Sequence, residues 1–201
     1  MKCLEAARGV LAYLGKTKHH KLTYGPMRNG NCSVYFADWQ PGPHELYCFF
    51  DSSWGRAPTA MSGHVVMYNG AAVSWSARKL KLIPLSSCEA ETACGSAACR
   101  DLRFVQLILN ELSQPGIVTT IEPGTRVITD SQSARDVVDN PGVTARTRHY
   151  ERWVHYMRHL ASHLHIRVYL VKTQAMLADI FTKAVGRSEI ATATRVLLNL
   201  E

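Results

Sequence analysis

Acidic residues at the ends of apolar segments are the first candidates for chemistry in this chain of 201 residues. Asp51 ends the apolar segment ELYCFFD, and Asp130 ends the segment RVITD. Both segments predict strands, and in open α/β sheets functional sites form outside the carboxyl ends of strands. An Asp in this position more often caps a turn, which is the simpler interpretation of either residue alone. On neighbouring strands, the two together favour a shared site.

A predicted long helix brings a further carboxylate toward the sheet. Its start, Ser86-Ser87-Cys88-Glu89, fits a capping box, which gives Glu89 a structural role. Glu91 follows two residues later, about 200° further around the helix axis, so both acids cannot face the sheet. Glu91 shares its face with the small residues Cys94 and Gly95, which let a helix lie close to a sheet. We therefore predict that Glu91 points inward.

Asp179 is the fourth candidate carboxylate. It lies between apolar pairs in the predicted helix from Ala175 to Lys183, an unfavourable place for a charge that only contacts solvent. Four carboxylates that converge on one point repel each other unless cations neutralise them. Hard oxygen ligands select Mg²⁺ or Mn²⁺.

Alternating strands and helices must position these residues. Strands are expected at residues 45–51, 63–68, 71–76, 126–130 and 166–171, with one or two more within 32–39. Asn69-Gly70 predicts a β-hairpin between the second and third of these strands. Helices are expected over about the first fifteen residues, from the capping box at Ser86 to the break at Pro115-Gly116, after Ser131, after His149, at 175–183 and from Ser188. This mixture predicts an α/β sheet of mixed direction.

Helical spacing also predicts which side chains are buried. Leu4, Ala7, Leu11 and Leu14 predict an apolar face on the first helix. Trp75 and Trp153 are both expected in the core. The predicted buried stripe of the long helix is Ala90, Ala93, Ala97, Val105, Ile108, Leu109 and Leu112.

Composition limits the function classes. Apolar residues make up 46% and charged residues 19%, which excludes disorder as the main description. The formal net charge of +7 favours a polyanionic partner, although a basic protein without one is about as probable from charge alone. Six cysteines without a CxxC pair, and the lack of any secretory leader or long apolar run, predict an intracellular, reducing location. Membrane insertion and a secreted protein are not expected.

Eight short motifs resemble, in order, the ribonuclease H domain of copia-type retrotransposon polyproteins, preceded by the end of the reverse transcriptase segment. Together they cover the chain from about Ala6 to about Val185. The motifs are Tyr13-Leu14-Gly15-Lys16-Thr17, Asp51-Ser52-Ser53-Trp54-Gly55, Ser62-Gly63, Val73-Ser74-Trp75-Ser76, Leu85-Ser86-Ser87-Cys88-Glu89-Ala90-Glu91, Asp130-Ser131-Gln132-Ser133-Ala134, Arg146-Thr147-Arg148-His149 and Ala178-Asp179-Ile180-Phe181-Thr182-Lys183.

The resemblance implies a ribonuclease H-like fold, a five-stranded mixed sheet with helices on both faces. It also implies three parts of the chain. Residues 1–44 would be the N-terminal helix and connector at the end of the reverse transcriptase segment, 45–185 the ribonuclease H domain, and 186–201 a helical tail. The implied partners are an RNA–DNA hybrid and the reverse transcriptase domain of the same polyprotein, in a cytoplasmic virus-like particle or the nucleus.

The same resemblance implies that Asp51, Glu91, Asp130 and Asp179 are metal-binding, catalytic carboxylates. Glu151, in the family's His-x-acid motif, is the alternative to Asp179. The implied reaction is endonucleolytic hydrolysis of the RNA strand of a hybrid with two Mg²⁺ ions, for which Mn²⁺ substitutes, and with no small-molecule cofactor.

The nucleic acid is expected to contact residues near these carboxylates. Two departures from the family pattern, Ser53 in place of a second Asp and Ser131 in place of an Asn, keep an alternative open. In that alternative the module has lost its catalytic activity and only binds nucleic acid. The candidate contact residues are Ser131, Gln132, Arg146, Arg148, His149 and Lys183.

Overall fold

Five strands form one mixed sheet in the computed structural model, which describes residues 2–28, 34–54, 59–81, 83–113, 124–140 and 148–200. Their order across the sheet is β3-β2-β1-β4-β5. Strands β1, β2 and β3 pair antiparallel, whereas β4 and β5 run parallel to β1. The predicted mixed sheet is confirmed. The strands are β1 Leu46–Ser53, β2 Met61–Tyr68, β3 Ala71–Lys79, β4 Thr125–Thr129 and β5 Ile166–Leu170.

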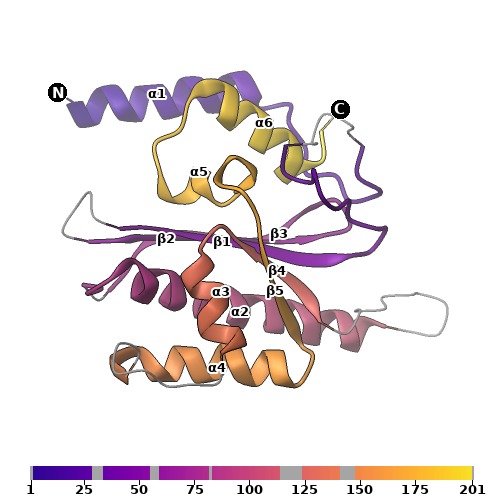
Figure 1. Cartoon of the computed structure of the whole chain (residues 1–201). Helices are drawn as coiled ribbons and strands as arrows, with labels where there is room; N and C mark the ends of the chain where they lie inside the picture. The colour runs from indigo at the N-terminus through magenta and orange to yellow at the C-terminus, as the bar shows by residue number, and fades with distance from the viewer. Residues whose placement is uncertain are drawn as a thin grey trace.

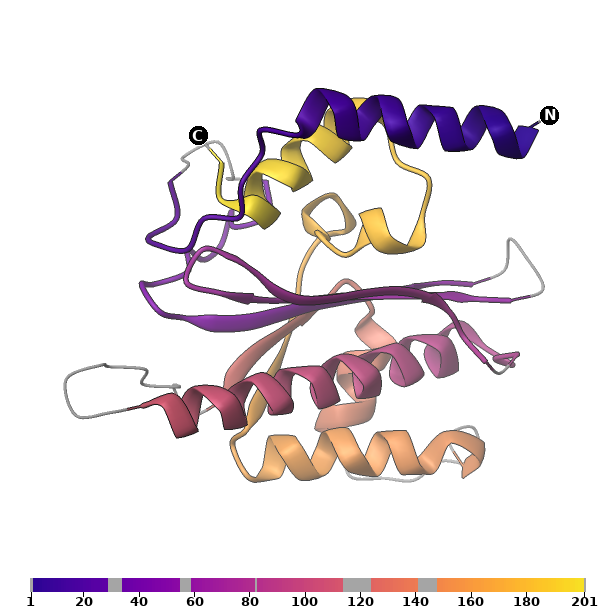
Figure 2. The ribbon, with the colours of Figure 1, turned by 180° about the vertical axis from the view of Figure 1, so that it is seen from behind.

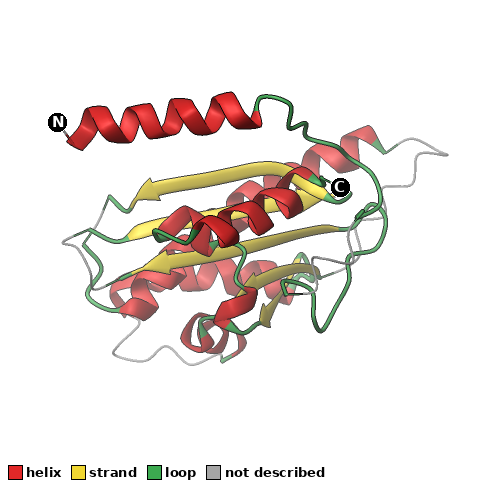
Figure 3. Cartoon of the chain, turned by 90° about the horizontal axis from the view of Figure 1, so that it is seen from above, coloured by secondary structure: helices red, strands yellow, loops and turns green. Residues whose placement is uncertain are grey.

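Helices cover both faces of the sheet, as predicted (Figure 1). Helices α2, α3 and α4 lie on one face, and α5, α6 and α1 lie on the other, which the view from behind also shows (Figure 2). Seen from above, α6 crosses over the strands and α1 lies beyond one edge of the sheet (Figure 3). The helices are α1 Lys2–Thr17, α2 Ser87–Leu112, α3 Gln132–Asp139, α4 Glu151–Ser162, α5 Asp179–Thr182 and α6 Arg187–Leu198.

The predicted hairpin turn joins β2 to β3. Asn69 and Gly70 have φ angles of 47° and 83°, the left-handed conformations that a type I′ turn requires. Gly70 has a second reason to lack a side chain, because a Cβ there would lie 2.5 Å from the main-chain oxygen of Gly25. The turn therefore fixes the β2–β3 register and carries the segment that follows α1.

The core is divided by the sheet into two apolar clusters. Strand β1 contributes to both because its side chains alternate between the two faces. Cys48 and Phe50 pack toward α2 and α4, whereas Tyr47 and Phe49 pack toward the segments around α5 and α6. All four side chains are fully buried, so β1 is the centre of the fold.

The buried stripe of α2 differs from the predicted one in its second half. Ile108 and Leu112 are 38% and 62% exposed, so their predicted burial is wrong. Gln106 occupies the core position instead, and its amide donates to the Thr125 hydroxyl at 2.8 Å and the main-chain oxygen of His165 at 3.0 Å. A hydrogen-bonded polar side chain thus replaces an apolar one, which an apolar pattern cannot reveal.

Trp75 was expected in the core but is 59% exposed. It lies on β3, an edge strand whose burial decreases after Ala72. The apolar face predicted for the first helix is likewise exposed: Leu4, Leu11 and Leu14 on α1 are 55–68% accessible. The periodicity of apolar residues predicted this strand and this helix correctly. It does not show whether another element covers their apolar side chains.

Two predicted elements differ from the expectation: a strand is absent over residues 34–39 and a helix is shorter. Residues 34–39 form turns and no strand, while Cys32 and Ser33 lie outside the described residues. The helix predicted over residues 175–183 is a 3₁₀ turn at Thr173–Ala175 followed by the four-residue α5. Met176, Leu177 and Ala178 between them are buried, so this segment enters the core instead of continuing a helix. None of the helices in the described ranges is both long enough and apolar enough to span a membrane.

Candidate active site

Three of the predicted carboxylates converge at one end of the sheet. One carboxylate oxygen each from Asp51, Asp130 and Asp179 lies within 4.8 Å of the other two. Asp51 belongs to β1, Asp130 follows β4, and Asp179 begins α5. Because β1 and β4 are parallel neighbours, their carboxyl ends meet at the same edge, as the sequence predicts.

Asp51 is held by α5, which approaches the sheet closely at Gly63. The Asp51 carboxylate is 2% exposed, and the Thr182 hydroxyl donates a hydrogen bond to its Oδ2. Gly63 is the β2 partner of Asp51, and a Cβ there would lie 2.6 Å from Cβ of Phe181 and 2.7 Å from Cγ2 of Thr182. The missing side chain at Gly63 therefore makes room for α5 to bring its hydroxyl to the carboxylate.

Lys183 forms ion pairs with two members of this cluster. Its Nζ lies 2.8 Å from Oδ1 of Asp179 and 3.5 Å from Oδ2 of Asp51. Burial raises the pKa of Asp51 to about 6, although Thr182 and Lys183 oppose the shift. Burial likewise raises the pKa of Asp179. The Lys183 ammonium group thus only partly offsets the effect of burial on the pKa values of Asp51 and Asp179.

Glu91 points toward the sheet, as predicted, but stands beside the three-carboxylate cluster. Its Oε1 accepts a hydrogen bond from the main-chain N–H of Ser52 at 3.3 Å, next to Asp51. Its Oε2 is buried with no hydrogen-bond partner. Burial, and then repulsion from Asp51, raise the pKa of Glu91 to about 8. Glu91 therefore has a buried carboxylate oxygen that makes no hydrogen bond.

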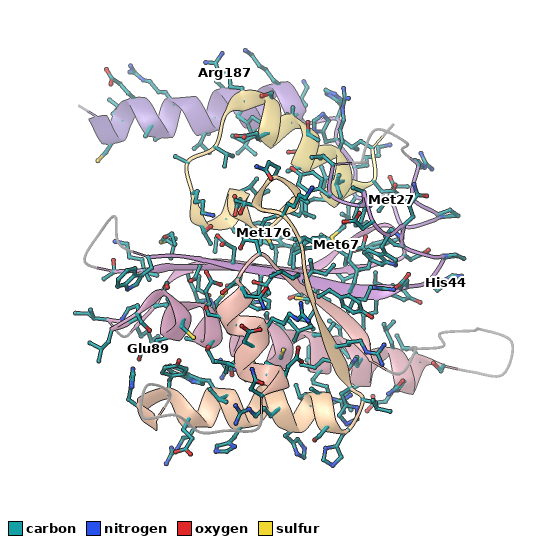
Figure 4. The ribbon with its side chains drawn as sticks, in the orientation of Figure 1. Met27, His44, Met67, Glu89, Met176 and Arg187 are labelled. Carbon is teal, nitrogen blue, oxygen red and sulfur yellow. The ribbon has the colours of Figure 1, made fainter. Side chains whose placement is uncertain are left out.

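Glu89 has the structural role that the capping pattern predicts, with one difference. Its N–H donates to the Ser86 hydroxyl at 3.1 Å, but its carboxylate accepts from the N–H of Leu85 at 2.6 Å, one residue earlier than in a standard capping box. The carboxylate also lies 3.1 Å from Nε2 of His149. Figure 4 shows Glu89 at the start of α2, on the side of α4. His149 is therefore anchored at the N-terminal end of α2.

The polar residues after Asp130 organise α3. The Ser131 hydroxyl accepts a hydrogen bond from the N–H of Ala134 at 3.2 Å and so caps this helix. The exposed Gln132 donates to the Asp136 carboxylate at 2.5 Å. Both residues lie next to the carboxylate cluster in the chain.

The two candidate arginines lie near the start of α4 in the chain. Arg146 lies outside the described residues, and Arg148 begins a 3₁₀ turn at Arg148–Tyr150. Glu151, the alternative fourth ligand, begins α4, and its Oε1 lies 3.2 Å from Nε2 of His155. The structure groups Asp179, and not Glu151, with Asp51 and Asp130.

Sequence reasoning missed three residues that shape the site. Thr182 holds Asp51, Gly63 makes room for α5, and the Cys94 thiol donates to the main-chain oxygens of Asp51 at 3.0 Å and Gly63 at 3.4 Å. Thr182 had a local signal, because it is three residues after Asp179 and shares its helix face. Gly63 and Cys94 act through contacts between distant elements, for which the sequence carries no spacing signal.

The donor set fits a hard divalent cation. The oxygens of Asp51, Asp130 and Asp179 come from separate elements and lie close together, and burial raises the pKa of Asp51 and Asp179. Beside them, Glu91 has a buried oxygen without a partner, and a cation that accepts oxygen ligands would stabilise such a group. Among the described residues, this is the one group of three or more His, Cys, Asp or Glu side chains with atoms close enough to hold a metal.

Solved structures share this fold. The N-terminal RNase H domain of a Mycobacterium tuberculosis protein aligns with a TM-score of 0.51 at 14% identity, covering 69% of this chain and 95% of that domain. An RNase H1 obtained from compost by a metagenomic approach aligns with a TM-score of 0.52 at 13% identity, covering 69% of this chain and 93% of the other. Identities this low establish the fold alone.

Curated relatives extend the comparison to sequence. The retrovirus-related Pol polyprotein from transposon TNT 1-94 of Nicotiana tabacum is 29% identical over 130 residues, 64% of this chain and 9% of the relative. That from transposon RE1 of Arabidopsis thaliana is 26% identical over 188 residues, 92% of this chain and 12% of the relative. This chain therefore spans only about a tenth of the length of these polyproteins.

No protein-family model matches the sequence. The structural and sequence comparisons nevertheless agree with each other and with the motifs in the chain. The chain is a homologue of retrovirus-related Pol polyproteins from plant transposons and has the RNase H fold, as the RNase H domain of such a polyprotein would.

Proposed function

We propose that this chain hydrolyses the RNA strand of RNA–DNA hybrids, as the ribonuclease H segment of a retrotransposon polyprotein. The observation that carries the proposal is the convergence of Asp51, Asp130 and Asp179 within 4.8 Å on an RNase H fold. Acidic clusters of this kind suit phosphodiester hydrolysis assisted by divalent cations. The proposed ions are two Mg²⁺, with Mn²⁺ as a substitute, and no small-molecule cofactor is required.

The carboxylates would hold these ions from four elements. Asp51, Asp130 and Asp179 supply the central oxygens, and Glu91 adds the buried oxygen that lacks a partner. When bound, such a pair of cations supplies activation of the attacking water and stabilisation of the leaving 3′ oxygen. Thr182 orients Asp51 through its hydrogen bond, and the Ser52 N–H orients Glu91.

The basic and polar residues around the cluster would contact the hybrid. Recognition through backbone shape, phosphates and 2′-hydroxyls needs no base contacts, so no sequence preference is expected. Lys183 is 35% exposed, and a phosphate becomes accessible to its ammonium group once cations neutralise the carboxylates. The proposed contact residues are Ser131, Gln132, Arg146, Arg148, His149 and Lys183.

The relatives suggest the wider context. Residues 1–44 would be the end of a reverse transcriptase segment, 45–185 the ribonuclease H domain and 186–201 its helical tail. The reverse transcriptase domain of the same polyprotein would then be a partner, in a cytoplasmic virus-like particle or the nucleus. The names of the relatives support this proposal, since both are Pol polyproteins.

Cleavage of an end-labelled RNA–DNA hybrid tests the proposal. We expect Mg²⁺-dependent cleavage of the RNA strand, no cleavage of duplex RNA or duplex DNA, and loss of activity in EDTA and in Asp130→Asn. Asp139→Asn, on the exposed end of α3, is the matched control and should cleave like the wild type.

The other outcome is equally informative. Salt-dependent binding of the hybrid without cleavage in Mg²⁺ or Mn²⁺ contradicts the catalytic proposal. It would leave a module that binds nucleic acid and has lost its chemistry.

A further inference from the structure

A groove of about 840 Å³ lies between α1 and α6, outside the carboxylate cluster. Figure 4 places Arg187 at the start of α6, on the side of α1. Most of the charged or aromatic side chains that line the groove are basic, and none is acidic. They are Tyr13, Lys16, His19, His20, Arg187 and Arg195.

Three hydrogen bonds link α1 and the chain that follows it to α6 and its C-terminal end. The Tyr13 hydroxyl lies 3.4 Å from the Thr194 hydroxyl, which joins α1 directly to α6. The N–H of Thr23 donates to the main-chain oxygen of Leu198 at 3.1 Å. The Asn199 side chain then accepts a hydrogen bond from the N–H of Arg28 at 3.0 Å. The chain after α1 is thus tied to the end of α6, and the groove is part of the fold.

The groove has a positive charge that the described part of the chain does not neutralise. Lys16, Arg187 and Arg195 are exposed, and none of them forms an ion pair with a described acidic side chain. The N-terminal end of α6 adds little to this charge, because Glu189 in its first turn offsets the partial positive charge there. The nearby Glu189 carboxylate accepts from the N–H of Gly186 at 2.7 Å and does not line the groove. The charge is therefore complementary to a polyanion.

We propose that this groove binds a single-stranded segment of nucleic acid. Proteins that bind single strands combine a cationic groove along the backbone with aromatic side chains on which bases stack. Lys16, Arg187 and Arg195 supply the cations, and Tyr13, 45% exposed, supplies a stacking surface with His19. A groove of this volume, closed by two helices, has the size of a site for a small ligand and not for a duplex about 20 Å across.

The groove begins close to the carboxylate cluster. Arg187 follows Lys183 by four residues, so their Cα atoms are at most roughly 14 Å apart. Lys183 contacts Asp179 and Asp51 directly. A strand that leaves a hybrid bound over the carboxylates can therefore continue into the groove. This continuity rests on the proposed ribonuclease H function, whereas binding of a single strand does not.

Fluorescence anisotropy with a labelled oligothymidylate of about 12 nucleotides tests the proposal on the full chain. Arg187→Ala/Arg195→Ala should weaken binding at least about tenfold at low salt, because two charged contacts are lost. It should also reduce the slope of log affinity against log salt by about 1.4. Arg100→Ala/Arg167→Ala removes the same charge from exposed positions on α2 and β5 and should bind like the wild type.

Cleavage of a short blunt hybrid separates this proposal from the proposed function. The groove variant should cleave it like the wild type but lose the advantage that a single-stranded overhang gives the wild type in binding. If the wild type cleaves no hybrid yet shows groove-dependent oligothymidylate binding, the catalytic proposal fails and the single-strand site stands. Equal binding by wild type and groove variant, an equal loss in the control variant, or groove-dependent binding of anionic phospholipid vesicles without oligonucleotide binding would overturn the single-strand site.

Discussion

Helices α2 and α5 approach the central strands from opposite faces, each through a glycine. On the α2 side, a Cβ at Gly95 would lie 2.9 Å from Cε of Met157 and 3.0 Å from the ring of Phe50. On the α5 side, a Cβ at Gly63 would lie 2.6–2.7 Å from atoms of Phe181 and Thr182. The two contacts are similarly close, but they join different kinds of surface.

The Gly95 contact lies among apolar side chains, whereas the α5 contact reaches the Asp51 carboxylate. The buried Glu91 lies nearer the N-terminal end of α2, one turn before Gly95. Helix α2 has 26 residues and packs its buried side chains against β1 and α4. Helix α5 has four residues, and its hydrogen bond and ion pair reach the Asp51 carboxylate. Each face has its own apolar cluster, so the comparison is between a contact that only packs the core and a contact that orients a carboxylate. Catalysis and folding should therefore be separable by substitution.

Asp51→Asn should separate the effect on catalysis from the effect on folding most strongly. Removing one proposed metal ligand should lower the rate of hybrid cleavage by at least about 10³-fold, because cation stabilisation of the transition state is worth several kcal/mol. Folding should be unaffected or improved in EDTA, because a buried charge is removed while Thr182 keeps an oxygen to which it donates. Single-turnover cleavage and urea denaturation measure the two effects, with Asp139→Asn as the control. A large loss of stability in Asp51→Asn would show that the two effects are not separable at this residue.

Gly63→Ala should affect both the site and the fold. The added methyl group forces α5 away from β2, which moves Thr182 and Asp179 relative to Asp51. Cleavage should fall about 10- to 100-fold, the usual cost of disturbing residues that orient metal ligands. The free energy of unfolding should also fall, by about 1–3 kcal/mol, because the new Cβ would lie closer than 3.0 Å to Phe181 and Thr182, so the cleavage rate is compared per folded molecule. Wild-type cleavage rates in Gly63→Ala would mean that the position of α5 has no role in catalysis.

Gly95→Val should affect the fold alone. The larger side chain overpacks the contact with Phe50 and Met157 and should reduce the free energy of unfolding by about 1–3 kcal/mol. The cleavage rate per folded molecule should remain close to that of the wild type. Urea denaturation followed by tryptophan fluorescence measures the first quantity, and active-site titration with hybrid measures the folded fraction. If the cleavage rate falls further than the folded fraction, the Gly95 contact also affects the active site, which contradicts the prediction.

The parts of the fold that could be predicted from sequence are those that depend on residues close together in the chain. The five strands of the sheet, the Asn69-Gly70 turn and the start of α2 depend on neighbouring residues, and the predictions for them are confirmed. The convergence of Asp51 and Asp130 also follows from sequence, because carboxyl ends of parallel neighbouring strands meet. The strands, the turn and the helix start have local causes, whereas the convergence follows from the general geometry of neighbouring parallel strands.

The predictions that are wrong have distant causes. Trp75 is exposed because β3 is an edge strand, and the buried position of Gln106 depends on Thr125 and the main chain at His165, elements far away in sequence. The space that Gly63 leaves for α5 likewise joins residues more than a hundred positions apart. No local pattern encodes such contacts, so only the three-dimensional arrangement reveals them.

Glu91→Gln provides the finest test, because it changes one buried carboxylate without removing its side chain. Burial raises the pKa of Glu91 from its ordinary value to about 8 in the folded protein. Between about pH 4.3 and pH 8, the folded state therefore holds a proton that the unfolded state releases, and stability declines as pH rises across this range. In EDTA, Glu91→Gln should flatten that decline and be more stable than the wild type, most clearly above pH 8.

Glu111→Gln, exposed at the far end of α2, should keep the wild-type pH dependence. Urea denaturation from pH 5 to pH 9 measures these slopes. Identical slopes for Glu91→Gln and the wild type would exclude Glu91 as the source of the pH dependence. Mg²⁺ should stabilise the wild type more than Glu91→Gln, because a cation bound at the cluster offsets the same repulsion.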